Sequence, residues 1–189
     1  MKRNIRYDNK SYVDAYHAYG IFPKIHDNIY SIIANIVPDG LAGIDIGSCT
    51  GLMSVRLVSQ GVMSHCVGFE KNIKYIEMAV KHDGVSYIHM DICKKTIADF
   101  NESLRTAQPK VAVCRRVLPE LSDVGLDFVD AFCNVLADNG VEYIAIEGRT
   151  PVKNPINKLS SIRHEQAAMS KRYKSVSEYK SCAVMRLKK

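Results

Sequence analysis

The sequence predicts an α/β protein, a three-layer α/β/α sandwich around a mostly parallel, seven-stranded sheet. Three observations support this prediction. Short apolar runs alternate with segments of helical spacing, which is typical of βα units. One unit, residues 41–57, has a glycine turn between its strand and its helix. The last two runs, 173–179 and 182–187, are joined by two residues and predict an antiparallel hairpin.

Two helices are expected ahead of the first strand. The first spans residues 11–19 and carries three tyrosines on one face, Tyr12, Tyr16 and Tyr19. These rings either pack the helix against the body of the protein or form an aromatic lid over a ligand. The second helix spans residues 25–37 and has isoleucines at helical spacing.

Residues 41–57 read LAGIDIGSCTGLMSVRL, an apolar strand with one acid, a glycine turn and a helix. Glycine lets the backbone turn sharply and approach a ligand closely. The free amides at the start of the helix favour a negative group. The turn lacks the Gly-Lys-Ser/Thr ending of a P-loop. It also fails the dinucleotide pattern G-x-G-x-x-G, because Cys49 and Leu52 stand at the second and third glycine positions. An ordinary strand-to-helix turn of another α/β protein remains the alternative.

The remaining pattern is D-x-G-x-x-x-G, formed by Asp45, Gly47 and Gly51. It resembles the first motif of the class I S-adenosylmethionine-dependent methyltransferases. The resemblance implies that Asp45 and the turn residues hold the methionine end of the cofactor, which carries an amine and a carboxylate. The turn residues assigned in this way are Gly47, Ser48, Cys49 and Gly51. Members of the family often have another glycine where this chain has Cys49, so we expect the backbone there to stand slightly further from the cofactor.

The second predicted strand, residues 65–69, ends at Glu70, and Lys71 follows it. The two oxygens of Glu70 can accept hydrogen bonds from the vicinal hydroxyls of a ribose. The alternative is a charge that stabilises the start of the next helix, which is predicted to reach His82. We expect Glu70 and Lys71 to contribute to the cofactor site.

The third predicted strand, residues 85–90, ends at Asp91, and Ile92 follows it. The resemblance implies that Asp91 accepts from the adenine amino group while apolar neighbours such as Ile92 flank the base. Ligands of open α/β sheets bind at the carboxyl ends of the strands. Asp45, Glu70 and Asp91 all stand at such ends, and we expect them to converge, although chance placement is the alternative.

The fourth predicted strand, residues 111–114, ends at Cys114, and two arginines follow it. The resemblance implies that this end faces the transferred methyl group, so Cys114 is expected beside the cofactor. The D/N-P-P-aromatic motif of many DNA amino-group methyltransferases is absent, which disfavours that class. Arg115 and Arg116 either clamp a substrate phosphate or carboxylate or pair with Glu120 or another neighbour. Glu120 either accepts a proton or serves as a first-turn helix charge. These three residues are the catalytic candidates.

The rest of the chain completes the sheet. A helix over residues 123–136 precedes a strand over 141–146. The loop at 150–155 is expected to form a wall of the substrate pocket. It is followed by a helix over 156–170 that carries His164, which acts either as a base or in a structural role.

Composition limits the class of protein. The chain has 189 residues, 47% hydrophobic and 24% charged, which predicts one globular domain. It lacks an apolar run of about 18 residues, and its basic start is not followed by an apolar segment, so neither a membrane span nor a secretory signal is expected. Its six cysteines show no zinc spacing, which indicates reduced thiols in a cytoplasmic protein and no metal site. The net charge of +6 suits an anionic partner such as nucleic acid.

The resemblance covers about residues 27–188. It implies the strand order 3-2-1-4-5-7-6, in a single domain with an N-terminal helical cap (1–40) and a Rossmann-like core (41–189). The expected activity is methyl transfer from S-adenosylmethionine to nucleic acid or to a small anionic metabolite. A non-catalytic S-adenosylmethionine-binding protein that acts through protein or nucleic-acid contacts is the alternative, which Cys49 and the missing fourth-strand motif leave open.

Overall fold

The computed structural model describes residues 9–122, 125–148 and 161–189. Its centre is a seven-stranded sheet in the order β3-β2-β1-β4-β5-β7-β6. Strands β1 to β5 are parallel, and β7 is antiparallel to both β5 and β6. The strands are β1 (Leu41–Ile46), β2 (Met63–Glu70), β3 (Val85–His89), β4 (Val111–Arg115), β5 (Tyr143–Glu147), β6 (Tyr173–Tyr179) and β7 (Cys182–Leu187). The predicted α/β class, strand order and terminal hairpin are confirmed.

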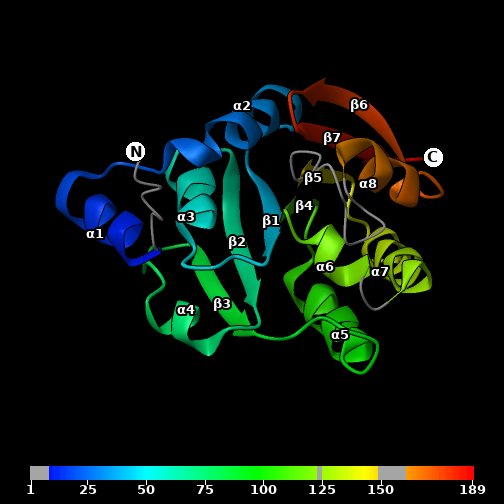
Figure 1. The fold of residues 1–189 in the computed structure, drawn as a ribbon, viewed down its shortest axis with the longest axis horizontal. Helices are drawn as coiled ribbons and strands as arrows, with labels where there is room; N and C mark the ends of the chain where they lie inside the picture. Colours follow the sequence, from blue (N-terminus) through cyan, green and yellow to red (C-terminus); the bar gives the residue numbers. More distant parts are fainter. Residues whose placement is uncertain (1–8, 123–124, 149–160) are drawn as a thin grey trace, which may run out of the picture.

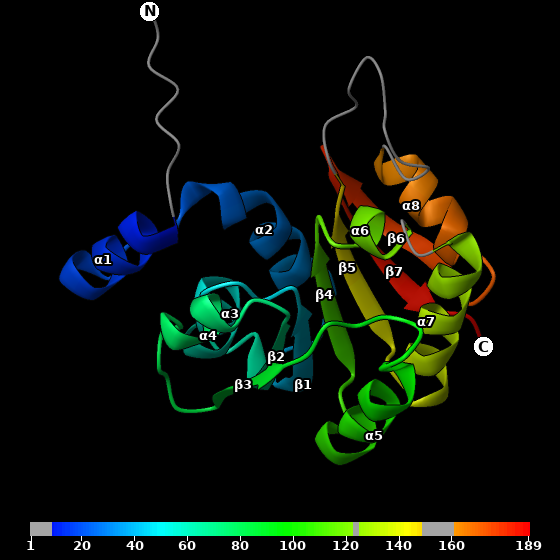
Figure 2. The same ribbon diagram turned by 60° about the horizontal axis from the view of Figure 1, so that its bottom comes forward.

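Helices cover both faces of this sheet and produce the three layers (Figures 1 and 2). The helices on one face are α2 (Asp27–Ile36) and α3 (Leu52–Ser59), and those on the other are α5 (Ile97–Ala107), α7 (Leu126–Asp138) and α8 (Ile162–Met169). Successive side chains of a strand point to opposite faces. In β4, Val111 and Val113 therefore pack in the core beside α2, whereas Ala112 and Cys114 pack in the core beside α7.

The N-terminal segment forms α1 (Asn9–Tyr19) and a short 3₁₀ helix, η1 (Lys24–His26), ahead of α2. Tyr12 and Tyr16 are partly buried and pack against a small core that joins α1 to α3. Tyr19 is 77% exposed. The packing interpretation of the tyrosine face therefore holds for two of the three rings, and Tyr12 also lines a cavity described below.

The helix after β2 is shorter than predicted, because α4 (Ile73–Glu77) ends well before His82. The chain leaves the helix since the backbone of Val80 is bound elsewhere. Its N–H donates to the carbonyl of Thr50 at 3.1 Å, and its carbonyl accepts from the Tyr87 hydroxyl at 2.8 Å. The segment after α4 is thus fixed by the glycine turn and by β3, which local sequence patterns do not reveal.

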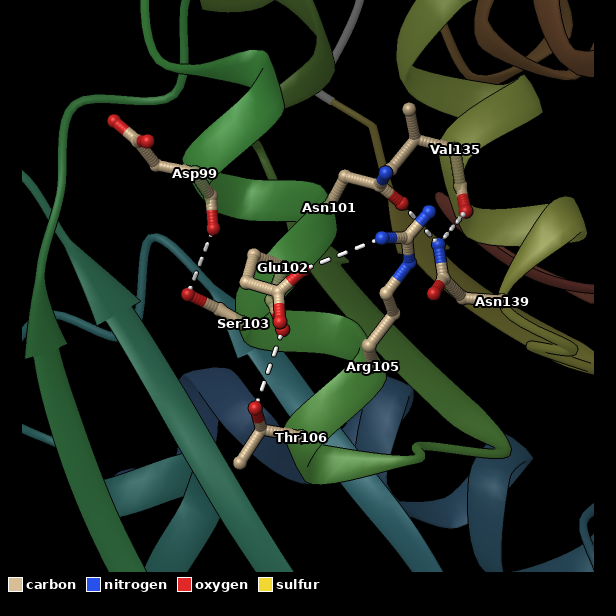
Figure 3. Close-up of polar contacts among 8 residues, drawn as sticks. All are labelled: Asp99, Asn101, Glu102, Ser103, Arg105, Thr106, Val135 and Asn139. Atoms are coloured by element: carbon tan, nitrogen blue, oxygen red, sulfur yellow. Dashed lines mark hydrogen bonds and ion pairs between the residues drawn. The ribbon is translucent and has the colours of Figure 1, made fainter.

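A polar contact joins α5 to the end of α7 (Figure 3). The side-chain amide of Asn139, the C-cap of α7, donates to the side-chain oxygen of Asn101 at 2.6 Å. Within α5, Arg105 and Glu102 form an exposed ion pair at 3.3 Å. An exposed pair of this kind contributes less than about 1 kcal/mol, so burial of its apolar face is what holds α5 on the sheet.

The cysteines are all free thiols, and four of the six are buried. None of the described helices is long and apolar enough to cross a membrane. Within the described ranges, no cluster of three or more His, Cys, Asp or Glu side chains is placed to hold a metal ion. The predicted loop at 150–155 and the first part of the predicted helix over 156–170 lie outside the described residues.

Candidate functional site

Two cavities lie at the carboxyl ends of the central strands. The larger, of about 470 Å³, is lined by the turn after β1 and by residues at and just after the ends of β2, β3 and β4. The smaller, of about 70 Å³, lies between the same turn, the end of β4 and the N-terminal segment. Gly47, Cys49 and Arg115 line both.

The cavities gather most of the predicted site residues. Those that line the larger cavity are Gly47, Cys49, Glu70, Lys71, Asp91, Ile92, Arg115, Arg116 and Glu120. Asp45 and Ser48 line the smaller one. Gly51 and Cys114 line neither, and His164 is exposed on α8, away from both. Cys114 is fully buried because strand alternation turns it into the core beside α7, on the face opposite Val113.

The turn after β1 requires left-handed backbone at three positions. Gly47, Cys49 and Gly51 have φ of +70°, +53° and +73°. A Cβ at Gly51 would lie 1.9 Å from the Tyr87 hydroxyl oxygen, and one at Gly47 would lie 2.5 Å from a methyl group of Val117. Both glycines are therefore needed for the backbone and for the packing of the protein's own side chains. Cys49 adopts a conformation usually left to glycine, which costs roughly 1–2 kcal/mol.

Glu70 ties this turn to the end of β2. Its Oε2 accepts from the N–H of Cys49 at 2.9 Å, and its Oε1 accepts from the N–H of Asn72 at 2.8 Å. The residue is only 7% exposed. A carboxylate oxygen has a second lone pair, so both oxygens can still accept from a ligand hydroxyl at the cavity wall.

Asp91 follows β3 with an exposed side chain. Its backbone carbonyl accepts from the Thr96 hydroxyl at 2.6 Å, which fixes the chain while the side chain lines the larger cavity. Ile92 and Phe69 are buried beside it and belong to the same wall. This part of the cavity therefore combines an acceptor with apolar surface.

Asp45 is 2% exposed and accepts from the Ser54 hydroxyl at 2.7 Å. Burial raises the pKa of Asp45 to about 7, against the opposing effects of the Ser54 hydrogen bond and of the Arg115 charge. A positive ligand group beside it would favour the charged carboxylate. The position is therefore suited to an ammonium group.

The two arginines are held by Glu147, which sequence reasoning did not identify as their partner. Arg115 and Glu147 are opposite each other in the β4–β5 ladder, and Nε of Arg115 lies 2.7 Å from Oε2 of Glu147. Arg116 has a left-handed backbone with φ of +60° and donates from Nε and Nη2 to Oε1 of Glu147 at 3.2 and 3.0 Å. Glu147 is 4% exposed. Both arginines therefore form an ion pair with a neighbour, as the second interpretation expects, and that neighbour is Glu147.

Glu120 lies on α6 (Leu118–Ser122), a short helix after β4. Its Oε2 accepts from Nζ of Lys71 at 2.8 Å. Both side chains are about half exposed, and both line the larger cavity. The ion pair connects the segment after β2 to α6 beside the cavity.

His26 was missed by sequence reasoning. It is 8% exposed, lines the smaller cavity, and has no hydrogen-bond partner for its Nδ1 among the described residues. Burial, together with the charge of Arg115, lowers the pKa of His26 to about 3, so the ring is neutral. No local pattern around Pro23 and His26 signals this placement, because it depends on how α2 packs on the sheet.

Comparisons with known proteins give similarity in structure only. The sequence matches no protein-family profile and no curated protein. Many solved structures are similar. WbdD, a bifunctional kinase-methyltransferase, has a TM-score of 0.64 and 14% identity over 92% of this chain and 41% of its own. Sp1610 of Streptococcus pneumoniae, a candidate tRNA (m1A22) methyltransferase, has a TM-score of 0.59 and 14% identity over 88% of this chain and 71% of its own.

A third similar structure is the magnesium protoporphyrin IX methyltransferase ChlM from Synechocystis PCC 6803 with bound SAH. Its TM-score is 0.53, with 12% identity over 85% of this chain and 81% of its own. Sp1610 has also been crystallised with S-adenosyl-L-methionine. The chain spans about two fifths of the length of WbdD. At these identities the likeness establishes the fold.

Proposed function

Because the chain has the class I methyltransferase fold, we propose that it is an S-adenosylmethionine-dependent methyltransferase. The observation that carries the proposal is the strand-end cavity of about 470 Å³, with the glycine turn at one wall and Glu70 and Asp91 at others. A volume of several hundred Å³ is typical of a cofactor site.

The residues that line the two cavities match the chemical groups of S-adenosylmethionine one by one. Glu70 offers two anchored oxygens to the ribose hydroxyls. Asp91 offers an exposed acceptor to the adenine amino group, with Ile92 and Phe69 as apolar neighbours of the ring. Asp45 is a buried carboxyl group, and the ammonium group of the ligand would supply a positive partner for its charged form. Bound S-adenosylmethionine supplies a methyl group already activated by its sulfonium.

The chain's own contribution is then to align the acceptor with the methyl group and to remove a proton where the acceptor requires it. Glu120 is the candidate proton acceptor, and Nζ of Lys71 lies 2.8 Å from its Oε2. Arg116, about half exposed, is the candidate for binding an acceptor phosphate or carboxylate. Each side chain is held in an ion pair in the structure, Glu120 with Lys71 and Arg116 with Glu147. On binding, each side chain either keeps this pair beside the acceptor or exchanges it for a contact with the acceptor.

For the acceptor we propose nucleic acid or a small anionic metabolite. The net charge of +6 and the arginines at the end of β4 support an anion. The likeness to Sp1610 adds support for RNA, since that protein is a candidate tRNA methyltransferase. A cytoplasmic location remains a prediction from the cysteine pattern.

One observation favours the non-catalytic alternative. Each predicted catalytic residue is held in an ion pair, Arg115 and Arg116 with Glu147 and Glu120 with Lys71. In that case the cavity would bind S-adenosylmethionine and the protein would act through contacts with protein or nucleic acid. Incubation with S-adenosylmethionine labelled on its methyl group, together with RNA, DNA or cell extract, separates the two, because only the enzyme transfers label.

Binding is tested by calorimetric titration with S-adenosylmethionine. Asp91→Ala removes a cavity-lining carboxylate, and we expect about a tenfold loss of affinity, as for a hydrogen bond to a charged group. Asp99→Ala is the matched control, because Asp99 is exposed on α5 away from the cavity (Figure 3). Glu70→Ala should abolish binding, with its fold checked by circular dichroism. Equal affinity in the wild type and both site variants would refute the assignment.

A further inference from the structure

A groove of about 370 Å³ lies where β6 begins and β7 ends, beside the label C in Figure 1. It is lined by Lys174, Arg186, Leu187, Lys188 and Lys189. Three of these residues, Lys174, Arg186 and Lys188, are exposed and are called the hairpin cations below. In the part of the chain that the structure describes, none of the three forms an ion pair with a carboxylate. This end of the hairpin therefore carries a local excess of positive charge.

Other cations near this end of the sheet are compensated. Each of them pairs with an acid: Lys171 with Asp130, Arg172 with Asp138, and Lys110 with Glu142. The hairpin cations differ from them. Nζ of Lys188 donates to the backbone carbonyl of Ser170, which carries no formal charge. The excess charge is thus confined to the groove and is not a general property of the surrounding surface.

Two of the hairpin cations stand directly opposite each other. Lys174 and Arg186 are partners in the β6–β7 ladder, and Arg186 is also opposite Tyr143 in the β5–β7 ladder. Directly opposite residues share a face of the sheet, with Cβ atoms about 4.5–5.5 Å apart, and like charges there are destabilising. The guanidinium of Arg186 lies 5.5 Å from the centroid of the Tyr143 ring, a contact that holds this charge in place. A repulsive pair that is held in position points to an anion outside the chain.

A purely structural role explains only part of this arrangement. An edge lysine discourages two sheets from pairing along their edges, and Lys174 stands on the edge strand β6. Arg186 is on β7, which lies between β5 and β6, and Lys188 follows the same strand. These two cations therefore do not protect an edge. A second copy of this chain is also disfavoured as the occupant, because two such positive surfaces would repel each other and because the register of β6 is irregular between Ser175 and Ser177.

The groove fits a chain of phosphates better than an anionic membrane. A membrane-binding surface combines cations with apolar side chains that insert among the lipids. Leu187, the apolar residue of the groove, is partly buried and packs on the core. Surfaces that bind nucleic acid are instead groups of Lys and Arg side chains that contact phosphates along the strand.

The groove lies within reach of a nucleic acid that also contacts the larger cavity. Arg186 is level with Tyr143 at the start of β5, whereas Glu147, the partner of Arg115 and Arg116, ends that strand. The two levels are four residues apart, or about 13 Å at 3.3 Å each, and β6 lies two strand spacings from β5, or about 10 Å. The separation of roughly 16 Å corresponds to about five phosphates, at about 3.4 Å per phosphate along a duplex strand.

We propose that the hairpin cations bind the sugar–phosphate backbone of a nucleic acid. The proposal rests on the proposed function, because it names nucleic acid as the acceptor and gives the chain a second contact with it, away from the reacting base. Contacts of this kind supply affinity that depends on salt and carries no sequence information. Selection of the methylated atom is then left to the larger cavity.

The test measures binding of fluorescein-labelled single-stranded RNA, and of DNA with the same sequence, by fluorescence anisotropy at several salt concentrations. The variant Lys174→Gln/Arg186→Gln is compared with the wild type and with Lys81→Gln/Arg105→Gln, a matched control that removes two exposed cations elsewhere. Each phosphate contact contributes about 0.7 to the slope of log K against log salt for a single strand. We expect the hairpin variant to lose about 1.4 from this slope and about 25-fold in affinity at about 0.1 M salt, and the control to change less than about threefold.

The arms of the experiment distinguish the two nucleic acids. A selective loss for RNA alone assigns the surface to RNA, and a selective loss for both assigns it to the backbone that they share; either result supports the proposal. Equal weakening by the hairpin variant and the control would overturn it, since binding would then follow net charge rather than this groove. It is also overturned if the wild type binds neither nucleic acid, or if the selective loss occurs only with vesicles that contain phosphatidylserine.

Titration with S-adenosylmethionine keeps this proposal separate from the proposed function. The hairpin variant should bind the donor as the wild type does, because the hairpin cations line neither strand-end cavity. If the wild type binds RNA through the groove but binds no donor, the proposed function fails while the surface stands. Should the double variant not fold, Lys174→Gln alone decides, since it changes one exposed side chain on an edge strand. A loss of about fivefold then supports the proposal, and unchanged affinity overturns it.

Discussion

Replacing Asp45 with Asn is expected to stabilise the ligand-free protein at neutral and alkaline pH while it removes donor binding. Asp45 is 2% exposed, and burial raises its pKa to about 7 from an ordinary value of 3.8. Ionising the carboxyl therefore costs more in the folded chain than in the unfolded one. Asn can still accept from the Ser54 hydroxyl, which donates to Asp45 at 2.7 Å, so the main change is the loss of titration.

The direction of the pH effect follows from proton linkage. Between pH 3.8 and 7 the folded protein binds more protons at Asp45 than the unfolded chain does, so the free energy of unfolding falls as pH rises. The stabilising contribution of the neutral carboxyl is complete below pH 3.8 and is lost as pH rises through 7. The whole effect corresponds to about 4 kcal/mol, of which roughly 2.5 kcal/mol is lost between pH 5 and pH 8.

The assay is urea unfolding of the wild type and Asp45→Asn at pH 5 and pH 8 without donor. His26 acts in the opposite direction, because its lowered pKa makes stability rise with pH up to about 6.5. That contribution is common to both proteins and cancels in their difference. We expect the variant to gain roughly 2.5 kcal/mol over the wild type between the two pH values. If the two stabilities change in parallel, the carboxyl is not desolvated and the ammonium site loses its physical basis.

The remaining predictions concern the turn and the arginine cluster. Cys49→Gly removes left-handed strain, so urea denaturation should find it about 1 kcal/mol more stable than Cys49→Ala, which keeps the strain; equal stabilities would contradict this. Gly51→Ala places a Cβ against the hydroxyl of Tyr87 and should lose about 2–4 kcal/mol of unfolding free energy and much of the donor affinity. Glu147→Gln leaves Arg115 and Arg116 without their carboxylate and should cost about 3 kcal/mol. A loss below 0.5 kcal/mol, roughly the effect of an ordinary surface substitution, would show that the arginines need no counter-charge.

The parts of the fold that follow from local pattern could be predicted from the sequence. The glycine turn fixes β1 and α3, since few residues other than glycine adopt positive φ, and the acids at the ends of β2 and β3 lie where open sheets bind ligands. The hairpin of β6 and β7 followed from two short strand-like segments joined by Lys180 and Ser181. Each of these features depends on residues close together in the chain.

The site residues that were predicted wrongly or missed depend on strand register and on how the helices pack. Cys114 was expected beside the cofactor, but its position in β4 turns it into the core beside α7. Strand alternation places the Cys114 side chain on the face opposite Arg115, which lines both cavities. The partnership of Arg115 with Glu147 depends on which strands are neighbours and in what register. His26 reaches the site only because α2 packs across the sheet, and no pattern within its own segment indicates this.

The places where this chain departs from ordinary backbone conformation support the location of the site. Four described residues other than glycine have positive φ, namely Cys49, Gln108, Arg116 and Lys180. Gln108 is the C-cap of α5 and Lys180 lies in the β6–β7 turn, where such a conformation has an ordinary structural reason. Cys49 and Arg116 instead line the strand-end cavities, beside the unpaired Ser48 hydroxyl. Strain and unpaired polar groups concentrated in one place are typical of a binding site rather than of a structural turn. Binding of the donor should therefore stabilise this region more than the rest of the protein, and hydrogen exchange with and without S-adenosylmethionine would measure it: slowed exchange at the turn after β1 is expected, and uniform protection would contradict the assignment.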